Sequence, residues 1–291
     1  MDFTNGNALL ALCKEQQLSI SEVMREREMT VGGSTPYEIE VKMDRVVEIM
    51  EHATHGPLTN PQKSMGGLIG GEAKQVTAFA KEKKPVCGDT LSKAIAYAMA
   101  VLEVNTSMGV IVAAPTAGSS GVVPGALIAV KEDFGLSEDD LKCGLYHASA
   151  IGYLLMRNAS VSGAEAGCQA EVGAASAMAA AALVEMLDGT PEQSLHAASL
   201  AISNLLGLVC DPIAGLVEAP CQSRNAIGVS NAFTCAQLAL SGVTHPIPFD
   251  EMAAAMYKVG RSIPFELRET AMGGNAGTPT GCSLGCDTCT Q

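Results

Sequence analysis

The stretch Thr35-Pro36-Tyr37-Glu38 decides the fold class, because it carries three signals for the start of a helix. Its threonine is a favourable N-cap residue, its proline suits the first helical position, and its glutamate stands three residues after the cap, as in a capping box. We therefore expect a helix from here to about Ala53. The His55-Gly56-Pro57 stretch that follows indicates a turn.

Signals of the same kind recur along the chain and predict further helices. A capping box at Ser19-x-x-Glu22 precedes a short charged helix, and N-cap residues open others. The longer expected helices run from Ser137 to about Leu155, Thr190 to about Leu206, Pro220 to Leu240 and Phe249 to about Val259.

Strand signals are few. The best is residues 109–113, Gly-Val-Ile-Val-Ala, which is equally compatible with a buried extended loop. Neither a βαβ alternation nor an internal repeat is present. We therefore expect a mostly α fold in which residues 1–291 form a single domain, with residues 277–291 as a cysteine-bearing tail.

Composition excludes several classes of protein. Apolar residues make up 47% of the 291 residues and charged residues 17%, as in a globular protein, and the net charge of −13 argues against a nucleic-acid partner. The longest apolar candidate, residues 174–186, is shorter than the about 18 residues that a membrane span needs, and it contains Glu185. The N-terminus lacks the basic and apolar regions of a secretory signal. We expect a soluble cytoplasmic protein that binds neither membrane nor nucleic acid.

Glycine-rich turns are unusually frequent between the expected helices. Glycine permits close backbone approach and leaves N–H groups free to point at an anion. Any one of these turns is explained as a plain connection, but together they favour a lined pocket. No phosphate-binding glycine motif is present, so a small carboxylate suits the pocket better than a nucleotide. The turns comprise residues 55–57, 65–71, 117–121 and 273–277.

Ten cysteines need an explanation in a protein expected in a reducing compartment. Cys168, Cys210 and Cys221 are isolated from one another, separated by 42 and 11 residues, and lack the close Cys-x-x-Cys pairs of structural zinc sites. Three such thiolates are able to hold three irons of a [4Fe–4S] cluster, which leaves the fourth iron open to act as a Lewis acid. Four other cysteines are expected to be small buried hydrophobes: Cys13, Cys87, Cys143 and Cys235.

The tail carries a second group of cysteines, Cys282-x-x-x-Cys286-x-x-Cys289. The spacing matches the cluster motif of radical-SAM enzymes, but only two residues follow Cys289, so no barrel can be built after it. Three alternatives stay open. One tail cysteine is a fourth, displaceable ligand of the main cluster, the tail binds a metal independently, or the terminus is idle.

Four long stretches resemble a known family. From about residue 60 to residue 277 the chain is similar to the iron–sulfur L-serine dehydratases, and in particular to the α chain of their two-subunit form. The motifs that carry the resemblance are Ala114–Pro124, Asn158–Gln169, Leu206–Gly215 and Pro220–Ala226.

The resemblance implies a lyase that converts L-serine to pyruvate and ammonia, an activity of amino-acid catabolism and gluconeogenesis, without pyridoxal phosphate. It implies a mostly helical catalytic domain in which glycine-rich loops line a [4Fe–4S] cluster held by Cys168, Cys210 and Cys221. Some relatives end in a cysteine that returns to the cluster as a fourth ligand. Cys289 is the candidate for that place here, although Cys282 and Cys286 compete with it.

Substrate contacts are expected from polar residues in the first two of these motifs. Their hydroxyl, amide and backbone N–H groups would fix the carboxylate and ammonium of the amino acid. Lys63 or Arg224 is expected to offset the carboxylate charge. The candidate catalytic residues are Lys63, Thr116, Ser119, Ser120, Asn158 and Ser160.

One element of the family pattern is absent. Single-chain relatives carry a candidate base in a Ser-Ser-Ser-His-Thr motif, which this chain lacks, and its five histidines have no carboxylate partner at a telling spacing. In the two-subunit form that motif belongs to a separate β chain. We therefore expect a β-chain partner that supplies the base, and little or no activity from this chain alone.

Two other functions fit the same cysteines. An iron–sulfur L-cysteine desulfidase would use the same open iron to expel sulfide in place of water. A non-catalytic iron–sulfur sensor would use the cluster, or the cysteine tail, to report redox state or iron supply.

Overall fold

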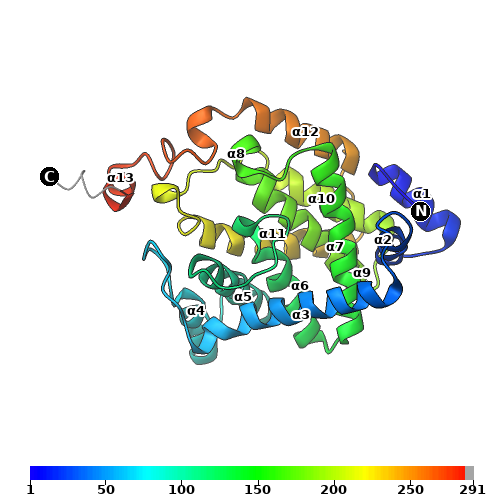
Figure 1. Ribbon diagram of the computed structural model, residues 1–291, viewed down its shortest axis with the longest axis horizontal. Coiled ribbons are helices and arrows are strands. Elements are labelled where there is room, and N and C mark those ends of the chain that lie inside the picture. Colours follow the sequence, from blue (N-terminus) through cyan, green and yellow to red (C-terminus); the bar gives the residue numbers. More distant parts are fainter. Residues whose placement is uncertain (286–291) are drawn as a thin grey trace.

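The computed structural model describes residues 1–285, and within that range the chain is built from helices joined by loops (Figure 1). Its only β pairing in that range is an isolated bridge between Cys210 and Arg268. The expected mostly α fold is therefore confirmed. The α-helices are α1 (Gly6–Gln16), α2 (Ile20–Thr30), α3 (Pro36–Thr59), α4 (Glu72–Glu82), α5 (Asp89–Thr106), α6 (Val122–Phe134), α7 (Glu138–Asn158), α8 (Gly163–Ala166), α9 (Ala174–Met186), α10 (Pro191–Asn204), α11 (Cys221–Leu240), α12 (Phe249–Ser262) and α13 (Pro279–Gly285).

Helix α9 forms the centre of the core. Its residues are buried all round except Glu185, and helices α6, α7, α10 and α11 pack against it. A helix that is apolar on every face belongs inside a protein. Seven of its thirteen residues are alanine, so the neighbouring helices can approach it closely from every side.

The predicted helix starts are confirmed at four positions. Each of the four residues caps its helix through a complete capping box, in which the cap side chain accepts an N–H bond and the third helical residue bonds back to the cap. The four caps are Ser19 of α2, Thr35 of α3, Ser137 of α7 and Thr190 of α10.

Helix α3 is longer than the sequence predicts. It was expected to end near Ala53, with a turn at residues 55–57, but it continues through Gly56 and Pro57 to Thr59. Proline in a helix removes one backbone hydrogen bond. Here Pro57 is buried, as are Ala53 and Thr54 in the turn before it, and α3 packs against α4 and α5. Burial of this face outweighs the local cost of the proline.

Residues 109–113, for which a strand and a buried extended loop were both open, form a loop, and it is not a buried one. Val110 is 66% exposed and residues 109–113 have no regular structure. The apolar run therefore lies on the surface, because no second strand in the described part of the chain is available to pair with it.

The four cysteines expected in the core divide into two pairs. Cys13 and Cys235 are buried, but Cys87 and Cys143 are exposed. Cys87 lies in the loop before α5. Cys143 is two residues after the buried Leu141 on α7, about 200° around the helix from it, and so faces outward.

Short elements between the long helices position the candidate site. These are α8, the 3-10 turns η1 (Ala117–Ser119) and η3 (Ile213–Gly215), and the π-helical turn η2 (Gln169–Gly173) that leads into α9. Figure 1 shows α13 at one edge of the molecule, away from the central helices. Among residues 1–285 there is no helix with both the length and the apolar character to cross a membrane.

Candidate active site

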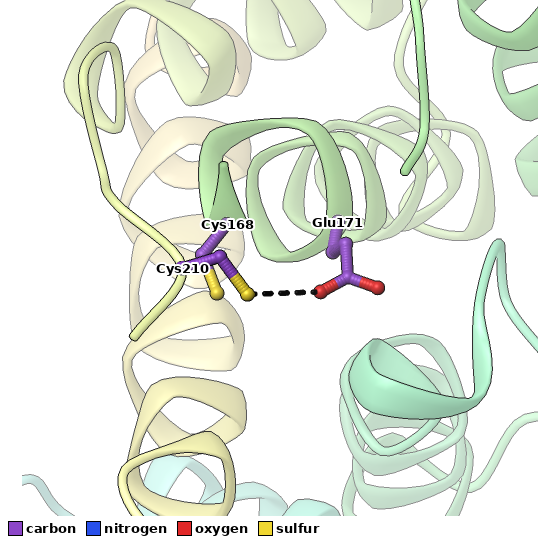
Figure 2. Close-up of side chains that lie close together, drawn as sticks. All are labelled: Cys168, Glu171 and Cys210. Carbon is purple, nitrogen blue, oxygen red and sulfur yellow. Dashed lines mark hydrogen bonds between the residues drawn. The ribbon is translucent and has the colours of Figure 1, made fainter. Parts of the chain in front are cut away.

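The fold brings Cys168 and Cys210 together in a buried group with Glu171, whereas Cys221 lies outside that group but near enough for the charge of Cys168 to act on it. Cys168 lies between α8 and η2, Cys210 follows α10, and Cys221 is the first residue of α11. All three are at most 7% exposed. The sulfurs of Cys168 and Cys210 and a carboxylate oxygen of Glu171 all lie within 4.8 Å of one another. Figure 2 shows the three side chains pointing toward one another.

Backbone hydrogen bonds join the two segments that carry Cys168 and Cys210. The N–H of Gln169 donates to Leu208 O at 2.9 Å, and the Gln169 side chain accepts from the N–H of Gly207 at 2.9 Å. The Cys210 N–H donates to Leu267 O at 2.8 Å. Cys210 is thereby held between the Cys168 turn and the segment before the tail.

Gly163 leaves the space in which these groups meet. A Cβ atom at this position would lie 2.7 Å from Glu171 Oε2 and 3.0 Å from Cys210 Sγ. The glycine of this motif is therefore required by close approach of the site side chains rather than by an unusual backbone angle.

Replacing Gly163 with alanine is expected to lower the iron bound per chain after anaerobic reconstitution. The added methyl group must push either Glu171 or Cys210 from its place. Iron and sulfide assays on the purified variant measure this directly. Gly56→Ala is the matched control, because a Cβ there meets no atom within 4 Å and the position is helical. Full iron content in Gly163→Ala would show that the crowding has no consequence for the site.

A buried cation stands beside the cysteines. Arg224 Nη1 lies 3.5 Å from Cys168 Sγ and donates to Val209 O at 2.8 Å, and Nη2 is 2.7 Å from Asp211 Oδ1. Asp211 in turn accepts two hydrogen bonds from Asn275, from its N–H at 2.6 Å and its side-chain amide at 2.9 Å. Arg224 therefore sits in a fixed network that joins the start of α11 to two of the cysteines.

The thiols differ in how readily they ionise. Hydrogen bonding to Cys210 lowers the pKa of Cys168, and the charge of Arg224 acts in the same direction against the effect of burial. The neighbouring Cys168 and burial both raise the pKa of Cys210. Burial raises the pKa of Cys221 to about 12. Cys168 is thus the thiol of the set that ionises most readily, and a thiol must lose its proton to bind a metal.

Glu171 is a site residue that the sequence reasoning missed. It lies in η2, where its Oε1 accepts a hydrogen bond from Thr116 Oγ1 at 2.9 Å and its Oε2 is 3.9 Å from Cys210 Sγ (Figure 2). Burial raises its pKa, and the Thr116 hydrogen bond partly opposes this. A signal was available, because position 171 is three residues after Cys168 in a helical turn, a spacing that places two side chains on one face.

The predicted hydroxyl residues differ in their hydrogen-bond partners. Thr116 Oγ1 is 3.1 Å from Ser119 Oγ and borders Glu171, whereas Ser120 Oγ donates to Ala117 O at 2.7 Å within its own turn. Ser160 Oγ donates to Glu165 at 2.6 Å. The structure thus brings Thr116 and Ser119 to the edge of the cysteine region.

The other two predicted site residues are Asn158 and Lys63. The Asn158 side chain donates to Thr4 O at 2.8 Å, so its amide is bound to the N-terminal segment rather than to the cysteine region. Lys63 is exposed in the glycine-rich loop before α4.

The base of the tail reaches the Cys210 loop. Helix α13 packs against η3, and the Asn275–Asp211 hydrogen bonds fix the segment before it. Cys282 is exposed, and its Sγ lies 3.5 Å from Ala276 O. The other two candidate tail ligands, Cys286 and Cys289, lie outside the described residues.

Comparison with known proteins places the chain in a family. The sequence model of the serine dehydratase alpha chain matches residues 15–276. A probable L-serine dehydratase alpha chain of Bacillus subtilis (strain 168) is 49% identical over 97% of this chain and 94% of its own length. The L-serine dehydratase alpha chain of Peptoniphilus asaccharolyticus is 48% identical over 94% of each chain. The chain therefore belongs to the serine dehydratase alpha chain family.

Longer relatives contain the same region within a larger chain. L-serine dehydratase TdcG of Escherichia coli (strain K12) is 36% identical over 94% of this chain, but the match covers 62% of the longer protein.

Proposed function

We propose that this chain is the α subunit of an L-serine ammonia-lyase that converts L-serine to pyruvate and ammonia. The observation that carries the proposal is the buried group of Cys168, Cys210 and Glu171 bordered by the Thr116 turn, with the buried Cys221 close enough to feel the charge of Cys168, in a chain of the serine dehydratase family. The proposed setting is cytoplasmic amino-acid catabolism.

The donor set fits a [4Fe–4S] cluster with three cysteine ligands. Three buried thiols from three separate segments, one of them with its pKa lowered beside Arg224, supply soft ligands without the paired spacing of a zinc site. When bound, such a cluster supplies a Lewis acid that helps the substrate hydroxyl to leave. Cys168, Cys210 and Cys221 would hold it, and a tail cysteine remains the proposed fourth ligand.

The chain's own residues would bind and orient the substrate. The hydroxyls of Thr116 and Ser119 lie together at the edge of the site, and Glu171 fixes the Thr116 side chain. Arg224 is committed to Asp211 and Val209 and so balances charge within the site rather than binding substrate. Lys63, exposed in a neighbouring loop, is the better candidate for the substrate carboxylate.

The proton-abstracting base is proposed to come from a β chain. The similar proteins of Bacillus subtilis and Peptoniphilus asaccharolyticus are named alpha chains, which supports a partner chain. The test compares anaerobically reconstituted α chain with the α–β complex in an assay for pyruvate. We expect L-serine turnover from the complex and little from the α chain alone. Equal activity of the α chain would refute the partner's role, and sulfide release from L-cysteine without serine turnover would favour the desulfidase.

Replacing Thr116 with valine is expected to lower kcat/KM for L-serine about tenfold, because a hydroxyl that is hydrogen-bonded at the site is lost. Thr116→Ser keeps the hydroxyl and is expected to retain most of the activity. Steady-state kinetics of both variants provide the measurement. Unchanged kinetics in the valine variant would remove Thr116 from the proposed substrate contacts.

A further inference from the structure

Glu218 is a buried acidic residue to which the proposed reaction assigns no role. It is 2% exposed and lies three residues before Cys221, in the loop that leads into α11. Burial of an ionised carboxylate is costly unless hydrogen bonds replace the water that it loses. The groups that supply those hydrogen bonds therefore indicate what Glu218 does.

Three donors from one glycine-rich loop surround the Glu218 carboxylate. Ser64 Oγ donates to Oε2 at 2.7 Å, the Gly66 N–H donates to Oε1 at 2.6 Å, and the Leu68 N–H donates to Oε2 at 2.9 Å. Backbone N–H groups that converge in this way form an anion-binding nest. This nest is filled by a side chain from 150 residues further along the chain.

The loop is closed around the carboxylate. The Ser64 N–H donates to Ile69 O at 3.1 Å, and the Ile69 N–H donates to Ser64 Oγ at 3.2 Å. A Cβ at Gly66 would lie 2.3 Å from Leu216 Cδ1 and 2.8 Å from Glu218 Oε1. Residues 64–69 are therefore fitted closely against the segment that carries Glu218.

Glu218 lies between two parts of the molecule. One is this loop, which Lys63 precedes, and the other is the start of α11, which carries Cys221. Its backbone carbonyl accepts the N–H of Gln222 at 2.9 Å, in the first turn of the helix that begins at Cys221. Lys63 immediately precedes Ser64, and its Cε lies 3.6 Å from the position of a Cβ at Gly67, so the lysine side chain follows the loop. These contacts of Glu218 thus relate the position of Lys63 to the start of α11.

We propose that Glu218 is a positioning residue that clamps residues 64–69 against the start of α11 and thereby holds Lys63 where it meets the carboxylate of the substrate. The inference rests on the proposed serine deamination and on the expected role of Lys63. Glu218 acts through the loop and through Lys63, not by contact with the substrate.

The test uses Glu218→Gln in the complete α–β enzyme. Glutamine replaces one acceptor oxygen with an NH₂ group, so in either orientation at least one loop donor faces another donor. We expect KM for L-serine to rise about tenfold or more, with a smaller change in kcat. Lys63→Ala is expected to raise KM similarly, and the double variant should be no worse than either single one. Glu218→Asp, which keeps the charge, should restore part of the affinity.

Hydrogen exchange tests the clamp without substrate. Peptides covering residues 64–69 should exchange faster in Glu218→Gln than in the unaltered enzyme. Asp250→Asn is the matched control, because the Asp250 carboxylate likewise accepts two backbone N–H bonds, from Gly6 at 2.6 Å and Asn7 at 3.2 Å, but at the start of α1. This control should speed exchange in α1 and leave KM unchanged.

Three results would overturn the proposal: unchanged KM in Glu218→Gln, multiplicative effects of Glu218→Gln and Lys63→Ala on KM, or unchanged exchange in residues 64–69. Absence of serine turnover in the unaltered complex would count against the proposed function instead. In that case the exchange measurement still decides the clamp, since it needs no substrate.

Discussion

Replacement of Cys210 with serine is expected to lower L-serine turnover by more than about a hundredfold, since loss of a direct ligand should exceed the 10–100-fold effect of losing an outer-shell partner. Cys210 lies with Cys168 and Glu171 in the one group of three potential ligands, all within 4.8 Å of one another, in residues 1–285. Serine occupies nearly the same volume but offers a hard hydroxyl in place of a soft thiolate, so it is a poor ligand for iron–sulfur centres. Iron content, the visible absorption spectrum and pyruvate formation should fall together.

Cys235→Ser provides the matched control for this prediction. Cys235 is also fully buried, but its Sγ contacts Asn204 and Asn231 between α10 and α11 rather than the site. We expect this variant to keep its iron content and most of its activity. Equal losses in the two variants would mean that cysteine burial in general, and not the three-cysteine site, accounts for the effect.

Replacement of Arg224 with methionine is expected to lower the free energy of unfolding by about 3 kcal/mol, because removing one partner of a buried ion pair leaves the other charge uncompensated. Arg224 and Asp211 are both nearly inaccessible, and their Nη2 and Oδ1 atoms lie 2.7 Å apart. The variant also loses the positive charge that lowers the pKa of Cys168, so we expect slower cluster reconstitution. Urea denaturation and the rate of iron incorporation measure the two effects.

Two further variants separate the ion pair from general damage. Arg45→Met breaks an exposed pair with Glu48 and should change stability by less than about 1 kcal/mol. Arg224→Met combined with Asp211→Asn removes both buried charges and should recover part of the lost stability. If the double variant loses as much free energy of unfolding as the two single variants together, the role assigned to the pair is wrong.

Local signals made much of the fold predictable. The capping residues Ser19, Thr35, Ser137 and Thr190 act within one turn of their own helices, so the helix starts follow from neighbouring residues alone. The end of α3 was predicted wrongly because the cost of Pro57 is local, whereas the burial that offsets it comes from other helices. The exposed position of Cys143 followed from its angle on α7, which the apolar pattern around it obscured.

The candidate site was predictable only in part. The motifs around Cys168, Cys210 and Cys221 pointed to these cysteines, but no spacing rule joins Thr116 to Glu171, which are 55 residues apart. Spacing likewise does not predict the buried pair of His147 with Glu185, whose Nδ1 and Oε2 atoms lie 2.7 Å apart. Such partners are chosen by the packing of helices against each other, and sequence patterns within one helix do not report it.

We propose that an open iron, held by this chain's three cysteines, meets the hydroxyl of L-serine. Electron paramagnetic resonance of the reduced cluster in the anaerobic α–β complex, recorded before and after adding L-serine, tests it most directly. We expect the cluster signal to shift with L-serine, and to shift less with L-alanine, which lacks the hydroxyl. A signal that L-serine leaves unchanged, in a complex that turns L-serine over, would contradict the claim.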